Sequence, residues 1–176
     1  MVFETGGMSI GFAGTDYDTF FANVSQQKIT YEEFGNKNVR DYKENNTSFA
    51  NVLTDIRNLF GLVTADRASS AAHPSLVLTE YELTTLRGAY ERTMLHGNAG
   101  KAIMTQAEYV LYGSYDPLTV TVTHILNNKL GIGWTSYAHT GVPVPVFAKG
   151  AGADLFAGNY HQEQIFNKLT ALTGVK

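Results

Sequence analysis

The feature that most restricts the fold is an alternating segment of valine and proline, Val142-Pro-Val-Pro-Val146. Alternation places the valines on one face, as in a β-strand. Pro143 and Pro145 have no backbone N–H, so one side of such a strand cannot pair fully with a neighbour. We therefore predict an edge strand over residues 142–148.

A turn of small residues precedes this segment and contains His139, Thr140 and Gly141. Loops that lead into a sheet edge often carry functional side chains. On its spacing alone, however, a single histidine is more often a surface or hydrogen-bonding residue than a metal ligand. We expect His139 to be accessible to solvent or to line a shallow open cavity, because its neighbours are small and its strand is an edge.

Composition excludes several classes of protein. A chain of 176 residues is long enough for one domain, residues 1–176, with a hydrophobic core. The net charge of −3 gives no attraction for nucleic acid, and no apolar run is long enough to span a membrane. Because cysteine is absent, a bound metal would need ligands from His, Asp or Glu.

Most of the chain has the pattern of helices. Capping boxes at Thr30-x-x-Glu33 and Thr79-x-x-Glu82 indicate two helix starts. Apolar residues at helical spacing predict a buried stripe over residues 48–60, which should end at Gly61. Further helices are expected over the following ranges: 79–95, 102–112 and a last segment ending at Gly174, with Ile165, Phe166, Leu169 and Leu172 facing inward.

Residues 117–130 fit two patterns. Alternating β-branched residues from Thr119 to Thr123 favour a strand. The spacing of the leucines, Val122 and Ile125 favours a helix instead. The helix is preferred because Asp116-Pro117 is a strong helix start and Gly131 is a natural stop. His124 lies on this helix and is assigned to no site.

The run Gly131-Ile-Gly-Trp-Thr-Ser-Tyr-Ala-His-Thr-Gly-Val-Pro-Val-Pro-Val-Phe-Ala148 resembles the C-terminal signature of alkaline phosphatases. In that family the histidine of His-Thr-Gly is a zinc ligand, and the corresponding residue is His139. The beginning of the chain, Val2-Phe-Glu-Thr-Gly-Gly7, is similar to the family motif Asp-His-Glu-Thr-Gly-Gly. The family's Asp and His ligate a second zinc, but Val2 and Phe3 have no lone pair for a metal.

The resemblance implies an α/β fold, a partial alkaline-phosphatase-like α/β/α sandwich. This segment of it would be mostly helical with few strands, and residues 1–176 would correspond to the C-terminal part of the family. The resemblance further implies zinc and magnesium as cofactors, phosphate monoesters as substrates, and a periplasmic or extracellular location. The partners that it implies are the missing N-terminal part of the fold or a second subunit of a homodimer.

The implied function is hydrolysis of phosphate monoesters, with this chain as a C-terminal fragment that contributes one zinc ligand and is inactive alone. No residue corresponds to the family's serine nucleophile or phosphate-binding arginine, so no catalytic residue is assigned. The implied site comprises the metal ligand His139 and two loops: Glu4, Thr5, Gly6 and Gly7, and Thr140 and Gly141. The alternative is a non-catalytic domain that kept the architecture, lost the metal site and acts by binding a partner. The intact His139 loop favours the first function, whereas Val2 and Phe3 favour the second.

Overall fold

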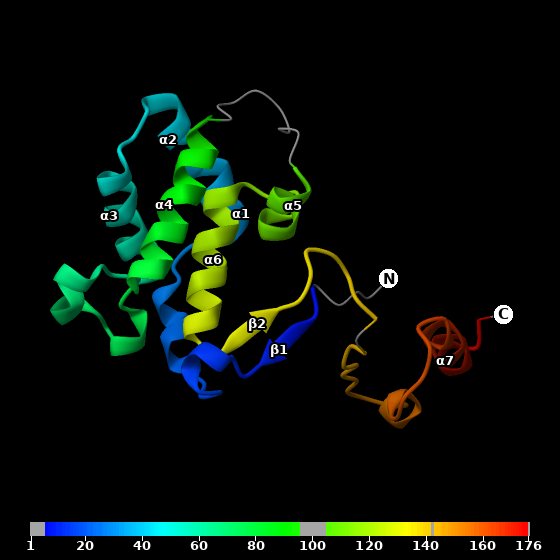
Figure 1. Ribbon diagram of the computed structural model, residues 1–176. Helices are drawn as coiled ribbons and strands as arrows, with labels where there is room; N and C mark the ends of the chain where they lie inside the picture. The colour runs from blue at the N-terminus through cyan, green and yellow to red at the C-terminus, as the bar shows by residue number, and fades with distance from the viewer. Residues whose placement is uncertain (1–5, 96–104, 142, 176) are drawn as a thin grey trace. The chain divides into compact units, whose positions relative to one another are not determined.

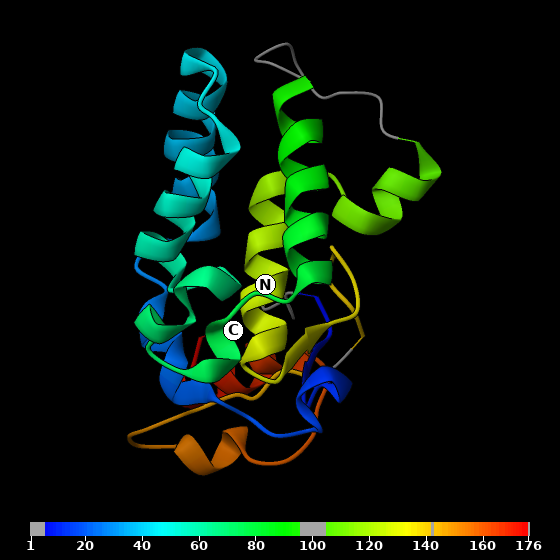
Figure 2. The same cartoon turned by 60° about the vertical axis from the view of Figure 1, so that its left-hand side comes forward.

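The computed structural model describes residues 6–95, 105–141 and 143–175 (Figures 1 and 2). The chain divides into two compact units. The first, Met8–Tyr137, is called the helical unit below; the second, Met1–Gly7 with Ala138–Lys176, is called the C-terminal unit. The expectation that residues 1–176 form one domain stays a prediction.

The helical unit is built mainly from helices, with a short sheet at the two ends of its sequence. Its α-helices are α1 (Tyr31–Glu33), α2 (Arg40–Asn45), α3 (Phe49–Phe60), α4 (Glu80–Leu95), α5 (Gln106–Tyr112) and α6 (Pro117–Lys129). The π-helix η3 (Phe34–Val39) joins α1 to α2. The described part of the unit also contains the short 3-10 helices η1 (Ala13–Thr15), η2 (Phe21–Gln26), η4 (Ala65–Ser70) and η5 (Pro74–Leu76).

The helix boundaries follow the capping residues in the sequence. The side chain of Ser48 accepts a hydrogen bond from the backbone N–H of Asn51, and α3 ends at Gly61 with φ of 71°. The predicted box at the start of α4 is present, because the N–H of Thr79 donates to Glu82 at 2.7 Å and the N–H of Glu82 donates to the Thr79 hydroxyl at 3.2 Å. The predicted helices at 48–60 and 79–95 are thus confirmed over their described residues.

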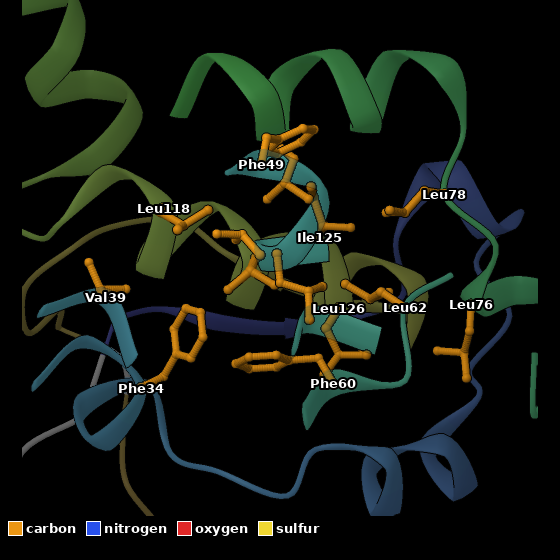
Figure 3. Close-up of a cluster of buried hydrophobic side chains, with 14 of the residues drawn as sticks. Phe34, Val39, Phe49, Phe60, Leu62, Leu76, Leu78, Leu118, Ile125 and Leu126 are labelled. Atoms are coloured by element: carbon orange, nitrogen blue, oxygen red, sulfur yellow. The ribbon is translucent and has the colours of Figure 1, made fainter. Parts of the chain in front are cut away.

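The core of the helical unit lies between α3, α4 and α6, and α4 and α6 pack side by side (Figures 1 and 2). Figure 3 shows the apolar side chains that meet there. Phe60 of α3 is fully buried and packs edge-on against Phe34, with ring centroids 5.0 Å apart. Leu118, Val122 and Leu126 of α6 are also fully buried or nearly so. The choice of helix over strand for this segment is therefore correct.

The sheet consists of two antiparallel strands, β1 (Met8–Ile10) and β2 (Ile132–Trp134), which lie side by side in Figure 1. Met8 pairs with Trp134, Ser9 with Gly133 and Ile10 with Ile132. Neither strand is predicted from the sequence, because each is only three residues long. The fold is mostly helical with few strands, which is consistent with an α/β fragment.

The predicted edge strand over residues 142–148 is wrong for its described part, residues 143–148, which form no strand. Val142 lies outside the described residues. Alternation predicts side-chain direction, but a strand also requires a paired backbone. Pro143 and Pro145 remove two donors from a short segment, and residues 143–148 form no ladder with another described segment.

The C-terminal unit contains the short 3-10 helix η6 (Ala153–Phe156) and the helix α7 (Gln164–Thr173). The expected stop at Gly174 is confirmed, with φ of 68°. The predicted inward stripe of α7 is wrong, because Phe166, Leu169 and Leu172 are exposed. Helical spacing shows that a helix has an apolar face, but it does not show that another element covers that face.

Candidate functional site

The two loops of the predicted site begin at the same end of the β1–β2 sheet. Gly7 directly precedes Met8 of β1, and Thr135 directly follows Trp134 of β2. Because Met8 and Trp134 are paired antiparallel, the sheet holds these two points of the chain side by side. His139 follows Trp134 five residues later along the chain. The pairing of β1 with β2 therefore gives a physical reason why the segment before β1 and the segment after β2 could contribute to one site.

The site residues that the structure describes belong to the C-terminal unit. Gly6 and Gly7 are buried, with φ of 145° and 65°, and Gly7 thus has the left-handed conformation that favours glycine. His139 and Gly141 are exposed and Thr140 is half-buried, so the expected accessibility of His139 is confirmed. Glu4 and Thr5 lie outside the described residues, together with Val2 and Phe3.

The described residues do not fit a zinc site. Within residues 6–95, 105–141 and 143–175, no group of three or more His, Asp or Glu side chains could hold a metal ion. A catalytic zinc takes about three protein ligands and keeps one position open. His139 can supply one of them, and the others would have to come from residues outside the described part of the chain or from a second chain.

Tyr137 and His124 form a stacked ring pair close to the His139 loop, and this contact was not predicted from the sequence. Tyr137 lies two residues before His139, and its ring stacks on His124 of α6 with centroids 5.7 Å apart and an interplanar angle of 9°. Burial lowers the pKa of His124 and raises the pKa of Tyr137. No spacing rule connects these two residues, because they come from different elements and meet only in the folded chain.

The contacts of Asp116 in the helical unit are structural. Asp116 caps α6 by accepting hydrogen bonds from the N–H groups of Leu118 and Thr119 at 3.0 and 3.2 Å. It also pairs with Lys43 at 3.2 Å and accepts a hydrogen bond from the Thr93 hydroxyl at 3.0 Å. These partners use the acceptor capacity of the carboxylate, so Asp116 is a helix cap and not a free acid or base.

A pocket of about 230 Å³ lies in the helical unit between α3, the segment that follows it and η4. Leu53, Leu62 and Val63 contribute apolar surface, and Arg57 and Arg67 contribute charge. Its lining includes no histidine, and none of its residues is part of the predicted site. The pocket therefore does not contribute to the His139 site.

Residues 119–175 match a family model described as alkaline phosphatase. The match covers about a third of the chain and includes most of α6, β2, the His139 loop and α7. No curated protein and no solved structure matches the chain. The resemblance to alkaline phosphatases is thus confirmed for the C-terminal part of the chain, whereas that of residues 2–7 stays a prediction. Among the described residues, no helix has the length and apolar character needed to cross a membrane.

Proposed function

We propose that this chain forms the C-terminal part of an alkaline-phosphatase-type hydrolase of phosphate monoesters, and that His139 supplies one zinc ligand to it. The observation that carries this proposal is the family match over residues 119–175, which contains the complete His139-Thr-Gly loop. The exposure of His139 supports it, because a ligand that is completed from elsewhere must be accessible.

The described residues do not bring together the metal ligands that this reaction needs. Transfer of a phosphoryl group spreads negative charge over the phosphoryl oxygens, and enzymes stabilise that charge with metal ions and cationic side chains. Among the described residues, His139 has no set of carboxylates or histidines beside it that could complete a metal site. We therefore expect no turnover of an aryl phosphate by the purified chain, even with added zinc and magnesium. Robust zinc-dependent turnover that is lost in His139→Ala would contradict this expectation.

A zinc titration tests the role of His139 without requiring activity. The double variant Val2→Asp, Phe3→His restores the family motif, and it should bind zinc at least about tenfold more tightly than the unmodified chain, because more ligands then contribute. Adding His139→Ala to the double variant should reduce this affinity. His161→Ala is the matched control, because His161 is also an exposed histidine of the C-terminal unit. Equal effects of the two alanine variants would exclude a specific role for His139.

A non-catalytic domain that acts by binding a partner is the second candidate. The observation that favours it is the exposed apolar surface of the C-terminal unit, where Phe147 is 91% and Phe166 is 69% exposed. Where exposed apolar side chains form a contiguous patch, that patch is typical of surfaces that contact another molecule. Sedimentation velocity tests the simplest form of this candidate, self-association. The chain should sediment above its monomer mass, and Phe147→Ser with Phe166→Ser should restore the monomer.

A further inference from the structure

Tyr137 is the last residue of the helical unit, and the His139 loop begins directly after it. Its side chain is half-buried and contacts α5 and α6. The hydroxyl donates a hydrogen bond to the carbonyl oxygen of Leu111 in the last turn of α5. The ring lies parallel to the imidazole of His124 on α6. One side chain thus fixes the end of the helical unit to two separate helices.

Gly113 and Tyr115 complete the surroundings of this ring. The ring centroids of Tyr115 and Tyr137 are 6.1 Å apart. Tyr115 also packs edge-on against Tyr31 of α1, with ring centroids 5.8 Å apart. Gly113 has φ of +61°, and a Cβ atom at this position would lie 2.5 Å from Cγ of Tyr137. The ring of Tyr137 therefore occupies space that only a glycine at position 113 leaves open.

Through His124, Tyr137 contacts a helix that contributes to the hydrophobic core of the helical unit. α6, which carries His124, is capped by Asp116 and has Leu118, Val122 and Leu126 in the core. Consecutive Cα atoms are about 3.8 Å apart, so the Cα atom of His139 must lie within about 7.6 Å of the Cα atom of Tyr137. A fixed Tyr137 consequently restricts the positions that the imidazole of His139 can reach.

We propose that Tyr137 is a positioning residue that anchors the start of the His139 loop to α5 and α6 and so limits where His139 is presented. The anchoring stands on the contacts of the helical unit alone. Its use for zinc ligation rests on the proposed function.

Backbone ¹⁵N relaxation on the full chain tests the anchor. In Tyr137→Ala, the order parameters of residues 138–141 should fall from about 0.8 to below about 0.6, because the ring contacts and the hydrogen bond are lost. The order parameters of α3 should stay at their original values. Tyr109→Ala is the matched control, because Tyr109 lies on α5 but its side chain is 52% exposed. It should leave residues 138–141 unchanged.

Tyr137→Phe separates anchoring from a general loss of folding. It keeps the ring contacts with His124 and Tyr115 and lacks only the hydroxyl that bonds to Leu111. Its order parameters at residues 138–141 should lie between those of the unmodified chain and of Tyr137→Ala. Unchanged values in both variants, or an equal loss in Tyr109→Ala, would overturn the proposal. Failure of the proposed function would instead appear in the zinc titration as equal effects of His139→Ala and His161→Ala, with the relaxation result intact.

Discussion

The helical unit and the C-terminal unit are stabilised to very different degrees. The helical unit has a continuous cluster of buried apolar side chains and well-formed helix caps. In the described residues from 138 to 175, by contrast, no side chain is buried. Yet the family match includes all of this poorly packed region and only the last part of the helical unit. A helical core can be built from many different apolar sequences, so good packing in one region does not make its sequence specific to a family.

The largest difference between the units should appear when a phenylalanine is truncated in each. Phe60→Ala should lower the free energy of unfolding by about 3–5 kcal/mol, because Phe60 is 0% exposed and a cavity would remain beside Phe34. Phe166→Ala on α7 should cost about 0.5 kcal/mol or less, because its side chain is exposed. Urea unfolding followed by circular dichroism measures both. Equal costs would mean that α7 is packed in solution.

The cap of α6 should give the next largest effect. Asp116→Ala removes two backbone hydrogen bonds and leaves Lys43 without its carboxylate, at an expected cost of about 2–3 kcal/mol. Asp116→Asn keeps a capping oxygen and should lose about half as much. Ser48→Ala, which removes a simple cap from α3, is the control and should cost about 1 kcal/mol. If Asp116→Ala costs no more than Ser48→Ala, the contacts with Lys43 and Thr93 contribute nothing measurable.

Substitution of one glycine in each unit should have a smaller effect on stability, and at both positions a new side chain has room. A Cβ atom would meet no other atom within 4 Å at either Gly88 of α4 or Gly150 of the C-terminal unit. Gly88→Ala should stabilise the chain by about 0.5–1 kcal/mol, because alanine favours a helix interior. Gly150→Ala should destabilise by about 1 kcal/mol, because φ of +113° is unfavourable for alanine. Thermal unfolding of both variants measures this, and a stabilising Gly150→Ala would show that this turn changes its conformation freely.

The smallest expected effect is the pH dependence that His124 contributes. Burial lowers its pKa below the ordinary value of 6.5, so the folded state disfavours the charged imidazole. The stability that results is complete above the unfolded-state pKa and is lost as the pH falls through the lowered folded-state pKa. His124→Phe keeps an aromatic ring beside Tyr137 but cannot titrate. As the pH falls from about 7.5 to 5.5, the free energy of unfolding of the unmodified chain should decrease relative to that of this variant. A constant difference would contradict it.

The sequence predicted most of what depends on local pattern. The caps at Thr79 and Asp116 define helix starts, and the apolar stripe of residues 48–60 forms part of the core. These features were predictable because a cap and its helix lie within a few residues of each other. The His139 loop was recognised from its run of residues, and its resemblance agrees with the family match.

Features that depend on distant parts of the chain were not predictable in this way. The alternation of residues 142–146 indicated a strand, but no described residue pairs with residues 143–148. Three-residue strands such as β1 and β2 are too short to show alternation. The same limit applies to the site, because the contact between Tyr137 and His124 joins two elements whose side chains have no shared spacing.

The pairing of β1 with β2 has a consequence for how the chain can change during evolution. The chain leaves the sheet at Ile10 and returns to it at Ile132, where these two residues are paired. Just beyond them, the N–H of Gly11 donates to the carbonyl of Gly131 at 2.7 Å. The helices between Ile10 and Ile132 thus form the long loop of a single β-hairpin. Insertion or loss of whole helices within that loop leaves the positions of its two ends unchanged, so the helical body can diverge while the segments that flank the hairpin keep their sequence.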